Sequence, residues 1–219
     1  MTTGLHRRYA VYFCPSPDST WARASAQWLG WDVNTACALE SVGQAWVSTP
    51  QKYGFHATLK APFRPNAPDA LAGLLDSLQQ LAGRHQPIEL APQLNQIGSF
   101  WAFTQGQPCP ELNALEVDLV RSLEPHRAPL NPAEMAKRLQ ADLSPHQRAL
   151  LDRWGYPYVL DQFQFHLTLT GSDPAGAAGE LIHQHFAQAM ASPSWVRDLA
   201  LVGERQDGFF EVIHRQPLG

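Results

Sequence analysis

The sequence contains only three cysteines among 219 residues, and no two of them are close together. Cys14, Cys37 and Cys109 therefore predict neither a disulfide framework nor a cysteine-rich zinc site. This cysteine usage is typical of a protein of the reducing cytoplasm, which is where we expect this one to act. Residues 1–8 carry basic side chains but no apolar stretch and no small-residue cleavage site, so no export signal is expected there.

Long apolar runs and an excess of positive charge are missing as well. No apolar run approaches the roughly 18 residues that a membrane span needs, so a water-soluble protein without a membrane partner is expected. Because 44% of the residues are hydrophobic, the chain can still form a continuous core. The net charge of −4 argues against binding of a long nucleic acid. A small phosphorylated ligand and a monomer are expected instead.

Several well-known catalytic signatures are also missing. The sequence has no His-Glu-x-x-His run, no glycine-rich phosphate loop and no serine in a nucleophile elbow, so it does not support a metalloprotease, a P-loop enzyme or an α/β-hydrolase. His183 and His185 lie two residues apart in an expected helix, where their side chains diverge and cannot chelate one metal together. We therefore expect neither a metal nor a cofactor.

The spacing of apolar and turn-forming residues predicts a mixture of strands and helices. Strands are expected at residues 9–14, 53–62, 88–94, 99–104, 164–170, 196–204 and 209–214. Helices are expected from a cap at residues 18–20 to residue 28, at residues 69–82, after Pro110 and at residues 178–190, and residues 30–50 are expected to be mostly loop.

A helical insert is expected at residues 124–155. Asn131-Pro132 and Ser144-Pro145 each place a capping residue before a proline at the first helical position, and Gly155 closes the segment. On either side of this insert the chain repeats one order, in which a histidine-containing strand is followed by a helix and then by a pair of strands. We therefore predict an α+β fold in which residues 1–219 form a single bilobal domain. Its two pseudo-symmetric lobes would each be an antiparallel sheet backed by helices, with a central groove between them.

The repeat is sharpest in two five-residue segments, Phe55-His-Ala-Thr-Leu59 and Phe165-His-Leu-Thr-Leu169. Alternate side chains of a strand share one face, so the histidine and threonine of each segment should face the groove while its phenylalanine and leucine enter the core. The residues expected at the groove are His56, Thr58 and Lys60 from the first strand and His166, Thr168 and Thr170 from the second. A single His-x-Thr would be an ordinary strand feature, but a matched pair favours a function.

Two facing histidines suit the cleavage of a phosphoester, which needs one proton removed and another delivered on opposite sides of phosphorus. An unperturbed pKa of about 6.5 allows one imidazole to be neutral while the other is charged. We predict His56 and His166 as acid and base, in an order that the sequence leaves open. Thr58 and Thr168 would bind the non-bridging phosphate oxygens. Further candidates for substrate binding are Lys60, Thr170, Tyr53 and Arg205, with plain solvent exposure an equal alternative for Arg205.

The motifs His56-Ala-Thr58 and His166-Leu-Thr168 resemble those of the two-histidine (2H) phosphoesterase superfamily, whose members carry one His-x-Thr/Ser motif in each half of a duplicated fold. Residues 53–63 and 150–158 are similar, more particularly, to the branch found with bacterial phosphonate-utilisation genes. The resemblance implies a bilobal fold like that of 2′-5′ RNA ligases, and metal-independent cleavage of cyclic phosphates or 2′-5′ phosphodiesters. The phosphonate branch favours a small sugar cyclic phosphate or a related phosphorylated metabolite as substrate, over RNA ends.

Three alternatives stay open. A non-catalytic module could use the same groove to bind a nucleotide or a phosphorylated metabolite, and it would keep its affinity when His56 is replaced. An enzyme that processes RNA ends with 2′,3′-cyclic phosphates or 2′-5′ linkages would use the same two motifs. A metal-dependent hydrolase would lose its activity in the presence of a chelator, although no carboxylate lies near either motif.

Overall fold

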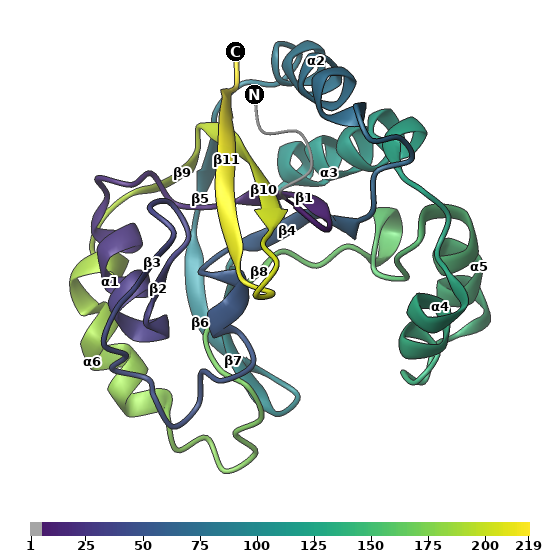
Figure 1. Cartoon of the computed structure of the whole chain (residues 1–219). Coiled ribbons are helices and arrows are strands. Elements are labelled where there is room, and N and C mark those ends of the chain that lie inside the picture. Colours follow the sequence, from purple (N-terminus) through teal and green to yellow (C-terminus); the bar gives the residue numbers. More distant parts are fainter. Residues whose placement is uncertain (1–5) are drawn as a thin grey trace.

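A computed structural model of the chain describes residues 6–219 (Figure 1). The first part of the segment in which no export signal is expected, residues 1–5, lies outside the described residues. None of the described helices is long and apolar enough to cross a membrane.

Most of the expected elements are present. The strands are β1 (Tyr9–Phe13), β2 (Trp31–Asp32), β3 (Cys37–Ala38), β4 (Ala57–Phe63), β5 (Ile88–Leu90), β6 (Pro92–Ile97), β7 (Phe100–Gln105), β8 (His166–Thr168), β9 (Ser194–Val196), β10 (Asp198–Glu204) and β11 (Phe210–Pro217). The helices are α1 (Thr20–Leu29), α2 (Ala70–Ala82), α3 (Pro110–Ser122), α4 (Pro132–Arg138), α5 (Pro145–Trp154) and α6 (Gly179–Met190). The expected mixture of helices and strands is confirmed, and the loop at residues 30–50 contains only the short hairpin of β2 and β3.

Two larger sheets carry the two histidine motifs. One sheet has the order β11-β10-β1-β4, the other has the order β6-β7-β8, and the neighbours within both are antiparallel. Each motif strand, β4 or β8, is therefore an edge strand. The strands that follow the first motif in the sequence, β6 and β7, join the sheet of the second motif, whereas β10 and β11 join the sheet of the first. The sequence halves are thus exchanged between the sheets.

Two expected strands are each divided between two sheets, so their predicted extents were wrong. Residues 88–94 form all of β5 and the beginning of β6, and residues 196–204 form the end of β9 and all of β10. The first pieces, β5 and β9, pair with each other, while β6 and β10 belong to the two larger sheets. Pro92 has no N–H for a continuous ladder, which accounts for the first break.

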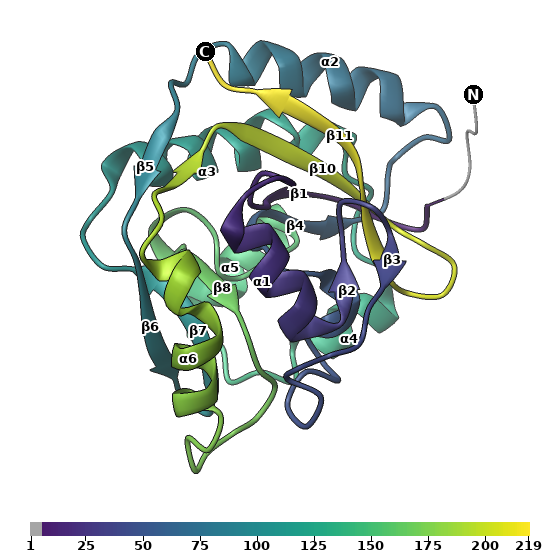
Figure 2. The ribbon, with the colours of Figure 1, turned by 90° about the vertical axis from the view of Figure 1, so that its left-hand side faces the viewer.

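The helices cover the two sheets separately. Helices α2 and α3 lie together against the sheet of β1 and β4, and α1 lies beside α6 (Figure 2). Trp21 of α1 and Phe186 of α6 both meet Phe103 of β7, with ring centroids 5.0 and 5.3 Å apart. Both expected helix starts of the insert are confirmed, because Asn131 and Ser144 each close a capping box at the beginning of α4 or α5.

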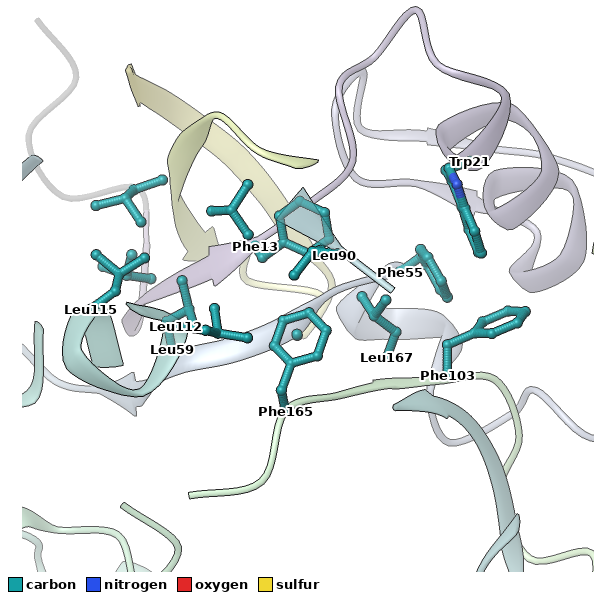
Figure 3. Packing of buried hydrophobic residues seen from close by; sticks show 14 of the residues in the cluster. Phe13, Trp21, Phe55, Leu59, Leu90, Phe103, Leu112, Leu115, Phe165 and Leu167 are labelled. Atoms are coloured by element: carbon teal, nitrogen blue, oxygen red, sulfur yellow. The ribbon is translucent and has the colours of Figure 1, made fainter. Parts of the chain in front are cut away.

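The apolar residues of both motifs meet in one core. Phe55, Leu59, Phe165 and Leu167 belong to the same buried cluster, in which Figure 3 shows them beside residues of β7 and α3. Full burial of a side chain of this kind contributes about 1.5–3 kcal/mol. The core therefore fixes both motif strands from behind and leaves their polar residues on the other face.

Candidate active site

A cavity of about 460 Å³ lies where the two motif strands approach each other. His56, immediately before β4, and Thr58 of β4 line it from one side, and His166 and Thr168 of β8 line it from the other. Thr170, just beyond β8, and Tyr53, just before β4, line it too. The structure therefore brings six of the predicted site residues to one cavity, and its volume is in the range of small-molecule sites.

Both imidazoles are held by the same local hydrogen bond. His56 Nδ1 lies 2.9 Å from the carbonyl oxygen of Gly54, and His166 Nδ1 lies 2.8 Å from that of Gln164. A carbonyl oxygen only accepts hydrogen bonds, so each Nδ1 carries a proton and donates it. The nitrogen that takes up and releases a proton is therefore Nε2 in both residues, and each ring is held in one tautomer.

Gly54 has a backbone conformation that makes its bond to His56 possible. Its φ of +68° lies in a region that side-chain-bearing residues rarely adopt. A Cβ at this position would also lie only 2.5 Å from Cβ of Val33. Both the torsion and the space require glycine, and the resulting turn directs the Gly54 carbonyl toward the imidazole two residues later.

His56 is in the drier of the two environments. The ring of Tyr12 from β1 stacks on it, with centroids 3.8 Å apart, and Tyr53 lies at 6.0 Å. Burial lowers the pKa of His56 to about 4, against a partial opposing effect of the Gly54 hydrogen bond, and the charge of His166 lowers it further. His56 is therefore neutral at pH 7, and the two imidazoles are close enough to influence each other.

The threonines of the two motifs differ from Thr170. Within residues 6–219, no hydrogen bond engages the hydroxyls of Thr58 and Thr168, which are half-buried at the cavity. Thr170 is buried, and its hydroxyl oxygen accepts a hydrogen bond from the backbone N–H of Trp101 at 2.9 Å. Thr58 and Thr168 are thus free to donate to a ligand, whereas Thr170 also has a structural partner.

Lys60 does not face the cavity, which corrects the expectation from strand alternation. A β-bulge in β4 places Thr58 opposite Tyr12 but Lys60 opposite Val11. The extra residue turns the Lys60 side chain to the other face of the sheet from Thr58. Its ammonium is buried and donates to Glu124 at 3.0 Å and to the carbonyl of Val120 at 3.1 Å. Lys60 therefore anchors the strand to the end of α3.

Arg205 does not line the cavity either. It lies in the turn between β10 and β11, where its guanidinium pairs with Asp207 at 2.9 Å and with Glu211 at 3.6 Å. It also covers the ring of Trp31 at 5.5 Å. Because Arg205 is engaged by these partners away from the cavity, the expectation that it binds phosphate there is corrected. The alternative, an ordinary surface arginine, describes it better.

Sequence reasoning missed several residues of the cavity wall. The insert contributes Glu134, Lys137 and Arg138, the segment just after it contributes Tyr156 and Tyr158, and other segments contribute Arg8, Lys52 and Tyr12. The spacing of residues 134, 137 and 138 places them on one face of α4, and this face has no apolar residue. This charged face was the available signal, because it is not expected to pack in a core.

Several known proteins are similar to this chain. Residues 58–211 match the family described as protein of unknown function (DUF1045). A protein of Janthinobacterium sp. (strain Marseille) named ribose 1,5-bisphosphate phosphokinase PhnN is 34% identical over 92% of this chain and 48% of its own length. A protein of the same name from Laribacter hongkongensis (strain HLHK9) is 31% identical over 92% of this chain and 49% of its own. The chain spans about half the length of these curated relatives.

Solved structures are similar at lower sequence identity. E. coli LigT complexed with phosphate has a TM-score of 0.47 and 13% identity, covering 98% of this chain and 99% of that chain. A structure described as a phosphoesterase has a TM-score of 0.44 and 15% identity, covering 97% of this chain and 98% of that chain.

In residues 6–219, no group of three or more histidine, cysteine or acidic side chains is arranged to hold a metal ion.

Proposed function

The chain belongs to the DUF1045 family, and we propose that it is a metal-independent phosphoesterase that opens a small cyclic phosphate or phosphodiester. One observation carries the proposal. The histidines of the two separate motifs line one cavity, and each donates its Nδ1 proton to a backbone carbonyl and so keeps Nε2 for proton transfer. The same two motifs support membership of the 2H superfamily, in which paired histidines do this chemistry.

His56 is the proposed base and His166 the proposed acid. With a pKa of about 4, His56 is neutral in the free protein and can accept a proton at Nε2. Water attacks phosphorus as His56 takes its proton, and the bond from phosphorus to one ring oxygen breaks. His166 gives that oxygen a proton. Opening a cyclic ester from the other side would exchange the two roles.

Thr58 and Thr168 are the proposed ligands of the reacting phosphate. Their hydroxyls are free to donate to its two non-bridging oxygens, one from each side of the cavity. Hydrogen bonds of this kind position the phosphorus between the histidines and stabilise the charge that builds on those oxygens in the transition state. Tyr53 and Thr170 are the remaining candidates for contacts with the rest of the substrate.

A sugar cyclic phosphate is the proposed substrate class. The two curated relatives are named for a kinase that acts on ribose 1,5-bisphosphate, and this chain matches about half of each. A phosphoesterase that supplies such a kinase would open a cyclic phosphate on a phosphorylated ribose. This chemistry supports a role in phosphonate metabolism, as the resemblance of residues 53–63 and 150–158 suggests. We further propose that the protein acts as a monomer in the cytoplasm.

Two alternatives use the same cavity. A binding module would have no need of two matched proton-transfer groups, so the paired Nε2 atoms favour the enzyme. Processing of RNA ends would need a surface that follows a longer chain. Among the residues that line the cavity, the cations Arg8, Lys52, Lys137 and Arg138 instead gather around one site.

The proposal is tested by turnover of a panel of ribose cyclic phosphates and 2′,3′-cyclic nucleotides with chelator present. Wild type should open at least one member, and His56→Ala and His166→Ala should each lose about two orders of magnitude or more in kcat. His146→Ala is a matched control, because His146 bonds Asp161 at 2.8 Å and does not line the cavity. Mutants as active as wild type would mean that the two histidines are not the catalytic base and acid. Binding without any turnover would favour the binding module.

A further inference from the structure

Helix α4 contributes no residue to the core, because none of its side chains is buried. It is held instead by its capping box and by Arg64, whose guanidinium pairs with Glu134 at 3.1 Å. The residues of α4 that line the cavity are Glu134, Lys137 and Arg138. Their spacing of three and four positions places them on one face of the helix. The helix therefore turns a charged face, and not an apolar one, toward the cavity.

The charges around the cavity do not cancel. Glu134 is neutralised by Arg64, and Arg8 is engaged by Glu204 at 2.6 Å. Lys52, Lys137 and Arg138 also line the cavity, and among residues 6–219 none of the three pairs with a carboxylate. Three uncompensated cations thus meet at one cavity of a chain whose net charge is −4. Such a concentration of positive charge attracts an anionic ligand.

Two of these three cations, Lys52 and Arg138, lie against aromatic rings. The guanidinium of Arg138 lies 4.7 Å from the ring centroid of Tyr156, and the ammonium of Lys52 lies 5.1 Å from that of Tyr53. Both tyrosines line the same cavity. A guanidinium stacked on a ring keeps its N–H groups in the plane, where they can form two parallel hydrogen bonds to a phosphate.

One cyclic phosphate does not account for this much positive charge. A cyclic phosphodiester carries a single negative charge, and the free hydroxyls of Thr58 and Thr168 are available for its non-bridging oxygens. A phosphate monoester adds about 1.5 to 2 negative charges at pH 7. We infer that Lys137 and Arg138 form a second phosphate subsite, so that the substrate is a cyclic phosphate bearing a further phosphate monoester. This inference rests on the proposed function for the cyclic group but not for the second phosphate.

The first test compares two substrates that differ only in the second phosphate, ribose 1,2-cyclic phosphate with and without a 5-phosphate. Wild type should prefer the phosphorylated sugar in kcat/KM. The double variant Lys137→Ala/Arg138→Ala should lose about tenfold or more on that substrate, as expected when charged hydrogen bonds are removed, with little change on the other. Equal losses on both substrates, or no loss, would overturn the second subsite.

Arg153→Ala is the matched control. Arg153 lies in the same insert and covers an aromatic ring, that of Trp154 at 5.1 Å, but it does not line the cavity. The variant therefore removes one cation and one cation–aromatic contact from the insert, and it should leave the preference between the two substrates unchanged. The conservative variant Lys137→Arg, in a chain that retains Arg138, keeps the positive charge. It should therefore retain most of the affinity for the phosphorylated sugar.

A binding measurement separates this inference from the proposed function. Calorimetry with ribose 1,5-bisphosphate and ribose 1-phosphate measures how much the second phosphate contributes to binding, without any turnover. Tighter binding of the bisphosphate by wild type, lost in the double variant, would support the subsite even if no cyclic phosphate were opened. Equal affinities for the two ligands would refute it, whatever the activity.

Discussion

Tyr12 lies face to face with His56, with ring centroids 3.8 Å apart and ring planes at 24°. Tyr12 comes from β1 and is almost fully buried, at 1% exposure. Its ring therefore shields one face of the proposed base from water, and this desolvation is the main cause of the low pKa of His56. A residue 44 positions away in the sequence thus sets the charge state of the first motif.

The pH dependence of activity follows from this contact. A base works in its neutral form, so on the acid side kcat/KM should fall as the pH drops through the His56 pKa of about 4. Tyr12→Ala admits water and should raise that pKa toward the ordinary value of about 6.5, which moves the acid limb to higher pH. Tyr12→Phe keeps the ring and should leave the limb in place. NMR titration of His56 measures the shift directly, and an unchanged pKa in Tyr12→Ala would contradict this account.

Replacing Thr58 or Thr168 by valine should reduce kcat more than it raises KM. Valine has nearly the same shape but cannot donate to the phosphate oxygens, and loss of one such donor typically lowers kcat about 100-fold. Steady-state kinetics measures the effect. Thr35→Val is a suitable control, since that exposed hydroxyl bonds Asp32 and does not line the cavity. A rise in KM alone would mean that the hydroxyls bind the ground state.

Lys60→Met should lower stability and leave the chemistry intact. Lys60 is 3% exposed, and its replacement leaves the Val120 carbonyl without this donor and Glu124 with only Arg127 as its cationic partner. The free energy of unfolding should fall by about 2–4 kcal/mol, as expected when one partner of a buried ion pair is removed. Urea denaturation gives this value. A selective increase in KM with unchanged stability would instead mean that Lys60 takes part in substrate binding.

Glu116→Gln should stabilise the protein above pH 7. Burial raises the pKa of Glu116 to about 7, against a lowering by the Leu160 N–H and by Lys60. The unfolded chain loses this proton near pH 4.5 and the folded chain near pH 7, so the carboxylate reduces stability as the pH rises between these values. Glutamine removes that penalty, which is on the order of 1–3 kcal/mol.

Thermal unfolding at pH 5 and pH 8 measures the effect of Glu116→Gln. The gain in melting temperature should be larger at pH 8 than at pH 5. Glu111→Gln, at an exposed position of the same helix, should show no such difference. An equal gain at both pH values would mean that Glu116 is ionised throughout.

Sequence patterns were sufficient where the structure depends on neighbours along the chain. The two Phe-His-x-Thr-Leu frames predicted which residues enter the core and which line the cavity, and the Asn-Pro and Ser-Pro pairs predicted the starts of α4 and α5. The side of Lys60 could not be predicted in this way, because a bulge that depends on the pairing of β4 with β1 reverses it. The contact between Tyr12 and His56 depends on that same pairing.

Strand order was beyond sequence patterns for a similar reason. Local periodicity indicates that a segment is a strand but not which strand lies beside it, so the exchange of strand pairs between the two motif sheets could not be derived. The charged face of α4 at the cavity was predictable only in part. Its spacing was visible in the sequence, but only the fold shows that residues 137 and 138 point toward the histidines' cavity.

The exchanged strands also determine when the site can assemble. The sheet of β4, the strand that follows His56, takes its other strands from both ends of the described chain, β1 at residues 9–13 and β10 with β11 at residues 198–217. A ribosome must therefore synthesise nearly all of these residues before β1 can be enclosed between β4 and β10. Such distant pairings slow folding, since loop closure precedes the contacts that reward it. The first histidine is made early in translation but reaches its final surroundings among the last.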